Sequence, residues 1–106
     1  MGRLNRQKIW TNFLIPWKNK MKIELHRKFL KAYVRQPKKI REKFKEKRNL
    51  FIRDSLHPLL NNHTLTGEYK GCRSINITGD IRAIFYVKPD SSVVFINIGS
   101  HSELYE

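Results

Sequence analysis

The chain has 106 residues, which fits one small domain and leaves little room for a second. Hydrophobic residues make up 40% of it and aromatic residues 11%, a composition that excludes a wholly disordered chain. Its single cysteine, Cys72, cannot form a disulfide within the chain, which suits a reducing compartment, and we expect a cytoplasmic protein. No apolar run is long enough to span a membrane.

The charge is strongly basic and unevenly distributed. The formal net charge is +13, with 22 basic and 9 acidic residues. Residues 1–53 carry 18 of the basic and 3 of the acidic residues, whereas residues 54–106 carry 4 and 6. Such a basic half favours a polyanionic partner, either a nucleic acid or an acidic protein, over an anionic membrane surface.

The first twenty residues differ from the remainder of the chain. They contain Pro16 and no acidic residue, and a regular pattern of apolar residues begins only at Met21. We therefore expect residues 1–20 to be an N-terminal extension, or the product of an upstream start codon, with a short helix around residues 7–15. Residues 21–106 are expected to form the domain.

The next segment predicts a strand followed by two helices. Residues 22–25 alternate polar and apolar side chains, as a short strand does. Residues 27–36 place apolar side chains at helical spacing, and Pro37 then starts a second helix that runs to about Ser55. The buried faces are expected to hold Phe29, Leu30, Tyr33 and Val34 in the first helix and Ile40, Phe44, Phe51 and Ile52 in the second.

After a loop at residues 57–70, three strands are predicted in quick succession. They cover residues 73–78, 81–87 and 93–98, with turns at Gly79-Asp80 and at residues 89–91. Consecutive strands joined by short turns form an antiparallel meander. The sequence thus predicts an α+β fold in the order β-α-α-β-β-β, with a small antiparallel sheet packed on an αα-hairpin.

Strand alternation separates core positions from candidate site positions. In the strand 81–87, the alternate residues Ile81, Ala83, Phe85 and Val87 are all apolar and are assigned to the core. Arg82 then lies on the open face, where Asn76 of the preceding strand is expected to face the same concavity. An arginine on a strand more often forms an ion pair or contacts a phosphate than acts as a catalytic residue. Spacing alone therefore assigns Arg82 no catalytic role.

Neither a metal site nor a cofactor site is predicted. The four histidines are scattered without the spacing of metal ligands, and there is no glycine-rich loop of the kind that holds phosphates. His63 on its own would be a turn residue, and His101 near the end of the chain would be an exposed one.

Three separated blocks in residues 63–105 carry a resemblance to a known family. They are His63-x-Leu65-x-Gly67-x-Tyr69-x-Gly71-x-Arg73, then Gly79-Asp80-x-Arg82-x-x-Phe85-Tyr86, and finally Gly99-Ser100-His101-Ser102-Glu103-Leu104-Tyr105. In this order they resemble the YafQ-like branch of the RelE/ParE toxins of type II toxin–antitoxin systems. The resemblance covers about residues 21–106, and the family's fold agrees with the predicted order of elements.

The resemblance implies an endoribonuclease that cleaves mRNA, usually on the ribosome, without a metal or cofactor. The 2′-hydroxyl of the RNA attacks the adjacent phosphate, which requires a base, a cation and an acid. By match to the family's motifs, Arg82 would stabilise the phosphate charge and His101 would be the acid. His63 and Asp80 would position or activate the attacking group, and Tyr105 would stack on a base or orient it.

The resemblance also implies contacts with RNA and with a cognate antitoxin, expected to be acidic. Arg73 and Asn76 would contact RNA or its phosphates, and the basic hairpin, including Lys43 and Lys47, would contact RNA or accept the antitoxin. Relatives often have His or Lys where this chain has Asn76, so His63 or Asp80 is left as the base. Some relatives also have an Arg at the position of Asn97.

Two other functions remain open from the sequence. A ParE-like toxin that poisons DNA gyrase would have the same fold, although such proteins generally lack the ending with His101. A catalytically weak module that binds RNA or the ribosome would use the basic hairpin alone, and Asn76 and Asn97 are compatible with it.

Overall fold

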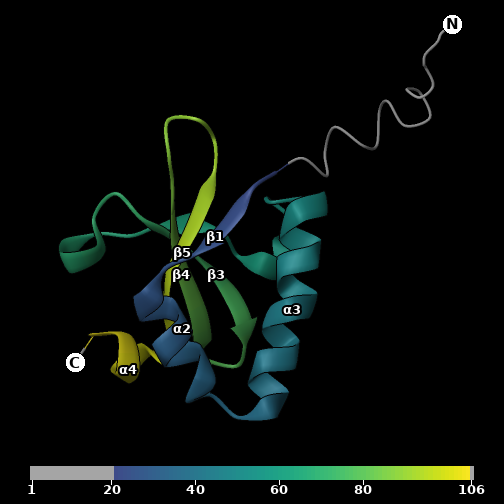
Figure 1. Cartoon of the computed structure of the whole chain (residues 1–106), viewed down its shortest axis with the longest axis vertical. Coiled ribbons are helices and arrows are strands. Elements are labelled where there is room, and N and C mark those ends of the chain that lie inside the picture. Colours follow the sequence, from purple (N-terminus) through teal and green to yellow (C-terminus); the bar gives the residue numbers. More distant parts are fainter. Residues whose placement is uncertain (1–20, 106) are drawn as a thin grey trace, which may run out of the picture.

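The structure is a computed structural model that describes residues 21–105 (Figure 1). The expected N-terminal extension, residues 1–20 with its helix around residues 7–15, lies outside the described residues. The helices are α2 (Arg27–Val34), α3 (Lys38–Arg53) and α4 (His101–Tyr105), with 3₁₀ helices η1 (Pro58–Leu60) and η2 (Gly67–Tyr69). The strands are β1 (Ile23–Leu25), β2 (His63–Thr64), β3 (Arg73–Thr78), β4 (Ile81–Val87) and β5 (Val93–Gly99).

The predicted α+β fold is confirmed, and its sheet has five strands in the order β1-β5-β4-β3-β2. The predicted meander pairs antiparallel as β3-β4-β5. Two features extend the prediction: β1 pairs in parallel with β5, and the expected loop 57–70 contributes the short strand β2 and both 3₁₀ helices. The sheet is therefore mixed, with β1 parallel to β5 and the other neighbouring strands antiparallel.

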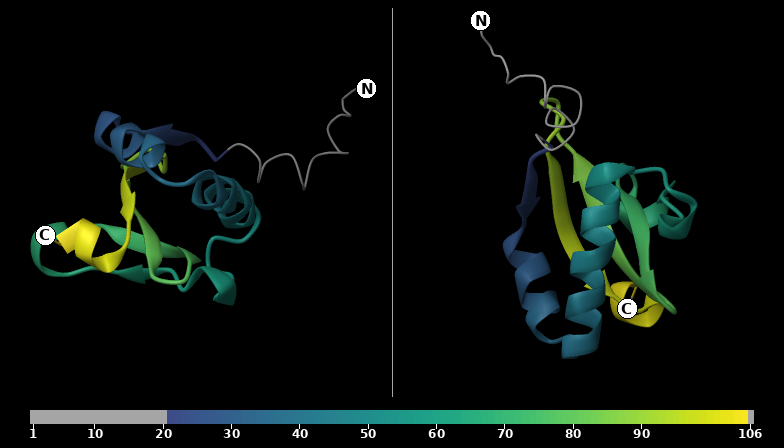
Figure 2. Two further views of the ribbon diagram at one scale, coloured as in Figure 1. Left: turned by 90° about the horizontal axis from the view of Figure 1, so that it is seen from below. Right: turned by 90° about the vertical axis from the view of Figure 1, so that its right-hand side faces the viewer.

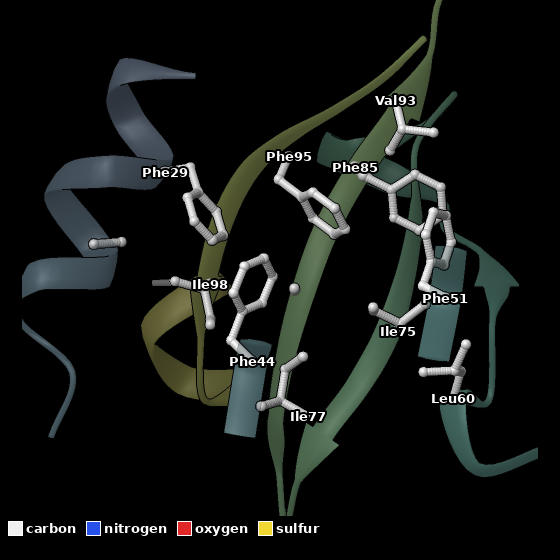
Figure 3. Packing of buried hydrophobic residues seen from close by; sticks show 12 residues of the cluster. Phe29, Phe44, Phe51, Leu60, Ile75, Ile77, Phe85, Val93, Phe95 and Ile98 are labelled. Carbon is white, nitrogen blue, oxygen red and sulfur yellow. The ribbon is translucent and has the colours of Figure 1, made fainter. Parts of the chain in front are cut away.

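Helices α2 and α3 cover one face of the sheet (Figure 2). The main core lies between these layers and includes phenylalanines from both helices and from the middle strands (Figure 3). Phe44 contacts Phe29 and Phe95 with ring centroids 5.1 and 5.3 Å apart, and Phe51 contacts Phe85 at 5.1 Å. Such aromatic pairs each contribute about 0.5–1.5 kcal/mol beyond the burial of their area.

Hydrogen bonds fix the start of α2 and the turn between the two helices. His26 caps α2, since its Nδ1 accepts a hydrogen bond from the backbone N–H of Lys28 at 3.0 Å. In the turn, the Tyr33 hydroxyl donates to the carbonyl of Arg41 at 3.2 Å, and Nη1 of Arg41 donates to the carbonyl of Gln36 at 2.6 Å. The hairpin is thus held by side chains as well as by its core.

The prediction of a buried position is wrong for three residues. Leu30, Val34 and Val87 are 44%, 68% and 53% exposed. Phe29 and Ala32 take the buried side of α2 instead, and Leu30 lies about 100° around the helix from Phe29. Val87 is the last residue of β4, and the two residues at this end of the strand are less buried than its middle.

A bulge in β5 changes which side chains face the second side of the sheet. Ile84 is paired with Asn97 and Phe85 with Phe95, so Ile96 is an extra residue without a partner on β4. Ile96 packs on a second, smaller cluster formed by Tyr69, Ile84 and Leu104, on the sheet face opposite α2 and α3. Asn97 points to the same cluster, since its side chain bonds to Tyr69.

Within residues 21–105, no helix is both long enough and apolar enough to cross a membrane.

Candidate active site

A small hollow of about 190 Å³ lies beside the second cluster and collects residues from separate parts of the chain. Two imidazoles, one guanidinium and one phenol line it, from β2, β4 and α4. These four side chains are His63, Arg82, His101 and Tyr105, and the remaining lining residues are Leu65, Ser74, Ile84 and Leu104. The structure thus brings together four of the five residues expected to be catalytic.

Arg82 is held in place by its own strand neighbours. Its Nε donates to Ser74 Oγ at 2.8 Å, and its Nη2 donates to the carbonyls of Asn61 at 2.8 Å and Ser74 at 3.3 Å. Strand alternation brings Ser74 to the same face, and the prediction that Arg82 lies on the face away from the helical layer is confirmed. The guanidinium therefore has a fixed orientation before any ligand arrives.

The remaining nitrogen of this guanidinium is free to bind a ligand. Among the described residues, Nη1 of Arg82 has no hydrogen-bond partner. Burial lowers the pKa of Arg82, the electrostatic interaction with Tyr105 raises it to a smaller extent, and an arginine stays protonated near neutral pH. The hollow consequently holds a half-buried positive charge, which suits an anion.

The carbonyl of Asn61 also determines the proton position on His63. Nδ1 of His63 lies 2.9 Å from the Asn61 carbonyl and 3.2 Å from Nη2 of Arg82. Both Nη2 hydrogens already have carbonyl acceptors, at Asn61 and Ser74, so Nδ1 of His63 is best satisfied as a donor to Asn61. In that tautomer Nε2 carries the lone pair, and His63 can accept a proton there.

Asn61 presents this carbonyl from a left-handed backbone conformation, with φ of 44° and ψ of 51°. Asparagine adopts this region more readily than most residues, whereas a β-branched residue is strained there. A residue of the loop thus orients two site residues through its backbone.

We expect Asn61→Gly to be tolerated and Asn61→Val to lower the free energy of unfolding by about 1–3 kcal/mol, the cost of strain in the left-handed region. Urea unfolding of both variants measures this difference. The neighbouring Asn62→Val is a poor control, because the Asn62 amide binds Arg73, so Thr64→Val, an exposed change on β2, serves instead. Equal stability of the glycine and valine variants would contradict the backbone argument.

The start of α4 is fixed by a reciprocal capping pair. The backbone N–H of Ser100 donates to Glu103 Oε1 at 2.8 Å, and the N–H of Glu103 donates to Ser100 Oγ at 3.2 Å. Gln36, which follows the C-cap residue of α2, donates to the same carboxylate at 3.4 Å. Gly99 leaves room for it, since a Cβ there would lie 2.9 Å from Glu103 Oε1.

These hydrogen bonds, that from Ser100 first, lower the pKa of Glu103. The capping interaction therefore stabilises the folded protein above the ordinary pKa of a glutamate, and this contribution is lost as the pH falls through the lowered value.

The end of α4 is fixed by a buried chain of hydrogen bonds. The side-chain amide of Asn97 donates to the Tyr69 hydroxyl at 3.1 Å, and this hydroxyl donates to the carbonyl of Leu104 at 3.2 Å. The ring of Tyr69 contacts that of Tyr105 edge-on at 5.5 Å. Tyr105 in turn lies 4.9 Å from the His101 ring, so both aromatic site residues of α4 have defined positions.

Removing only the Tyr69 hydroxyl should loosen α4. We expect Tyr69→Phe to lower the free energy of unfolding by about 1–3 kcal/mol, because the buried Asn97 amide and the Leu104 carbonyl lose their shared partner. Chemical denaturation measures the loss, and NMR line widths of His101 report the mobility of the helix. The matched control is Tyr86→Phe, since no hydrogen bond of the Tyr86 hydroxyl is found among the described residues. A Tyr69 variant as stable as this control would contradict the stabilising role of this chain of hydrogen bonds.

The structure leaves the other expected site residues outside this hollow. Asn76 is paired with Arg82 across the strands but does not line the hollow, and Asp80 is exposed in the turn between β3 and β4. Arg73 lines a separate hollow and donates from Nε to the Asn62 side chain at 2.7 Å. The expectation that Asn76 faces the same concavity as Arg82 is therefore not met by the geometry, and Asp80, expected to position or activate the attacking group, lies outside the hollow.

Lys43 and Lys47 are further away, on α3 in the layer that covers the opposite face of the sheet. Lys43 also forms an ion pair with Glu46, with Nζ and Oε1 3.3 Å apart. Contact of these lysines with a ligand in the hollow is excluded by their position, although a larger partner can reach them.

Sequence reasoning missed three residues that organise the site. Ser74 was visible only as a polar residue on the open face, Asn61 as a loop residue, and Tyr69 as a motif position without a role. The Asn61-Asn62 pair before His63 was the available signal for a left-handed turn at this point, because asparagine favours left-handed backbone. No sequence signal indicated that Asn97 holds Tyr69.

Within the part of the chain that the structure describes, no three residues among His, Cys, Asp and Glu are close enough to hold a metal ion. Cys72 is half-buried against the second cluster, and burial raises the pKa of its thiol, which disfavours the reactive thiolate. The polar groups with acid–base or ionic chemistry that line the hollow are its imidazoles, guanidinium and phenol.

The chain matches a family model over residues 19–106, and this family is described as bacterial toxins of type II toxin–antitoxin systems, YafQ. None of the curated proteins compared with the chain matches it. Among solved structures, YafQ from E. coli is 23% identical with a TM-score of 0.68 and is covered over 99% of its length by 81% of this chain.

Two further structures show the same fold. YafQ in the E. coli DinJ–YafQ complex is 25% identical with a TM-score of 0.63, and the match covers 81% of this chain and 99% of that one. A copper-bound mutant toxin from Helicobacter pylori is 26% identical with a TM-score of 0.61, covering 80% and 99%.

The fold is thus that of a small RelE-like toxin. With its match over residues 19–106, the chain belongs to the YafQ family of toxins of bacterial type II toxin–antitoxin systems.

Proposed function

We propose that the protein is an endoribonuclease that cleaves mRNA on the ribosome and requires no metal. The observation that carries the proposal is the hollow of about 190 Å³ in which His63, Arg82, His101 and Tyr105 meet. A base, a cation and an acid are the three groups that cleavage by the 2′-hydroxyl of RNA requires. All three can be supplied by side chains that line this hollow.

The reaction is a transfer of the phosphate from one oxygen to another. The lone pair on Nε2 of His63 takes the proton of the 2′-hydroxyl as this oxygen bonds to phosphorus. Nη1 of Arg82 binds a non-bridging oxygen and stabilises the charge that builds up on the phosphorane. The bond from phosphorus to the 5′ oxygen breaks, and His101 donates its proton to this leaving oxygen. The products are a 2′,3′-cyclic phosphate and a 5′-hydroxyl.

Tyr105 is proposed to hold a nucleotide base in the hollow. Its ring lies between those of His101 and Tyr69, and its own exposed fraction is 39%, so one part of it is available for stacking. His63 rather than Asp80 is proposed as the base, because Asp80 does not line the hollow.

The proposed partner in the cell is an antitoxin that covers the toxin. A solved E. coli structure is a DinJ–YafQ toxin–antitoxin complex, and the basic character of residues 1–53 favours an acidic partner. We propose that residues 21–106 form the toxin domain, that residues 1–20 are an extension to it, and that the protein acts in the cytoplasm, where mRNA and ribosomes are found.

The ends of the RNA products test the proposed chemistry. Purified protein is incubated with bacterial ribosomes that carry an mRNA, in the presence of EDTA and without it. In both cases we expect fragments with a 2′,3′-cyclic phosphate and a 5′-hydroxyl, which requires kinase treatment before 5′ ligation. Fragments with 5′-phosphates, or cleavage that EDTA abolishes, would overturn the metal-independent mechanism.

A further inference from the structure

Helix α2 carries cations without any acidic neighbour on the same helix. Arg27, Lys28 and Lys31 lie within α2 and Arg35 caps its end, and residues 25–41 contain no Asp or Glu. Among the described residues, the ion pairs involve other lysines, Lys22, Lys38, Lys43 and Lys88, so the cations of α2 are not neutralised in this way.

Helix α3 has more cations than α2, but some of them form ion pairs with carboxylates of the same helix. Two of its lysines are paired along the helix, Lys38 with Glu42 at 4.0 Å and Lys43 with Glu46 at 3.3 Å. The sequence led us to expect RNA contacts from the whole basic hairpin, including Lys43 and Lys47 of α3. On α2 itself there is no carboxylate, and none of its cations is in an ion pair among the described residues.

The cations of α2 line two adjoining hollows, called here the α2 groove, each with a volume of about 510 Å³. Lys28 and Lys31 line both hollows, and Arg35 lines the first. Lys28, Lys31 and Arg35 recur at helical spacing along about 10 Å of the helix axis, so they form one row. Two carboxylates, Glu68 and Glu103, also line the first hollow, and Glu103 is bonded to Ser100 and Gln36.

The α2 groove adjoins the candidate active site across α4. Leu104 lines both the first hollow of the groove and the active-site hollow, while Ser102 and Glu103 face the groove and His101 and Tyr105 face the active site. Figure 1 shows α4 beside the end of α2. A strand that leaves the active-site hollow over α4 would therefore meet the cations of α2 next.

We infer that the α2 groove binds the phosphates of the RNA strand that extends from the active-site hollow, with Lys28, Lys31 and Arg35 as the contacting residues. This inference rests on the proposed function, since the occupant is the same RNA. Lysine and arginine bind phosphates of single strands without reading their sequence, and each contact makes binding more dependent on salt. The groove thus lengthens the binding site and adds affinity without specificity.

Two matched triple variants of the full chain test the groove. The first is Lys28→Gln, Lys31→Gln and Arg35→Gln, and the control is Lys39→Gln, Lys45→Gln and Arg48→Gln on α3, which removes the same charge from the same residue types. The probe is a fluorescent RNA dodecamer with 2′-O-methyl groups throughout, which cannot be cleaved through its 2′ oxygens. Binding is measured by fluorescence anisotropy over a range of salt concentrations, and circular dichroism verifies the fold.

We expect the groove variant to bind the dodecamer at least about 10-fold more weakly at low salt and to lower the slope of log affinity against log salt by roughly 2, from three lost contacts. The α3 control should retain most of the affinity, and a dinucleotide, too short to reach from the active-site hollow along the row of cations, should not distinguish the two variants. Equal losses of affinity in both variants would overturn the inference that the α2 groove binds RNA, as would a wild type that does not bind the dodecamer.

Cleavage assays separate this inference from the proposed function. A wild type that binds the dodecamer through the groove but cleaves no mRNA would contradict the proposed function and leave the groove as a site. A wild type that cleaves mRNA while the groove variant binds and cleaves as well as the α3 control would contradict the groove alone.

Discussion

Arg82→Ala should reduce mRNA cleavage by roughly 10²–10³-fold, the cost of removing one preorganised group that stabilises transition-state charge. The guanidinium is anchored through Nε and Nη2, which gives the free Nη1 a fixed orientation. The substitution therefore removes a cation that the protein has already oriented. Single-turnover cleavage of an mRNA on ribosomes measures the effect, and growth arrest on expression should be relieved in parallel.

The matched control is Arg53→Ala, which removes the same charge from the exposed end of α3. Arg82→Lys distinguishes charge from geometry, because an ammonium group cannot reproduce the planar fork that binds Ser74 and Asn61. If Arg82→Ala remains folded and as toxic as the control, the assignment of Arg82 to the phosphate is wrong.

His101→Gln should lower the cleavage rate by roughly 10²–10⁴-fold, the usual contribution of a positioned general acid. The glutamine keeps a polar side chain at the start of α4 but cannot donate a proton to the leaving oxygen. Binding of the uncleavable dodecamer should change little, because the ring of Tyr105 and the guanidinium of Arg82 remain.

His57→Asn is the control for this histidine. His57 caps η1 by accepting from the N–H of Leu59 at 3.1 Å, and asparagine can cap in the same way, so only the imidazole is lost. Full toxicity of a folded His101→Gln protein would remove His101 from the mechanism, while a loss in both histidine variants would indicate a general effect on stability.

Periodicity alone was sufficient for most of the fold. The alternation of Ile75 and Ile77 with Ser74 and Asn76 predicts which face of β3 is buried, and the structure buries both isoleucines completely. The meander followed from two short turns. The parallel pairing of β1 with β5 was not predicted, because no local pattern specifies the partner of a three-residue strand that is separated from β5 by the whole helical hairpin.

The exposed side chains of α2 show a second limit of periodicity. Leu30 and Val34 fit the helical spacing as well as Phe29 and Tyr33 do, but a helix of eight residues turns only one face to the sheet. Which apolar residues are buried was decided by the packing of Phe29 against Phe44 and Phe95, contacts that join segments far apart in the sequence.

The candidate site divides in the same way. The four side chains that line the hollow were found through the family's motifs, which name residue types in order. The groups that orient them were not found, because a backbone carbonyl such as that of Asn61 leaves no trace in a side-chain pattern. Asn97 looked like a departure from the relatives' arginine, yet its amide anchors Tyr69, a role that depends on the bulge at Ile96.

Primer extension on an mRNA in a translating bacterial extract determines whether this toxin cuts mRNA on the ribosome. With purified wild-type protein we expect new cuts within codons that require translation and that are lost with His101→Gln. Cuts on naked RNA as well would show a ribonuclease whose activity does not require the ribosome. The absence of any cut with folded protein would contradict the proposed ribonuclease activity and favour a gyrase poison or an RNA-binding protein without catalytic activity.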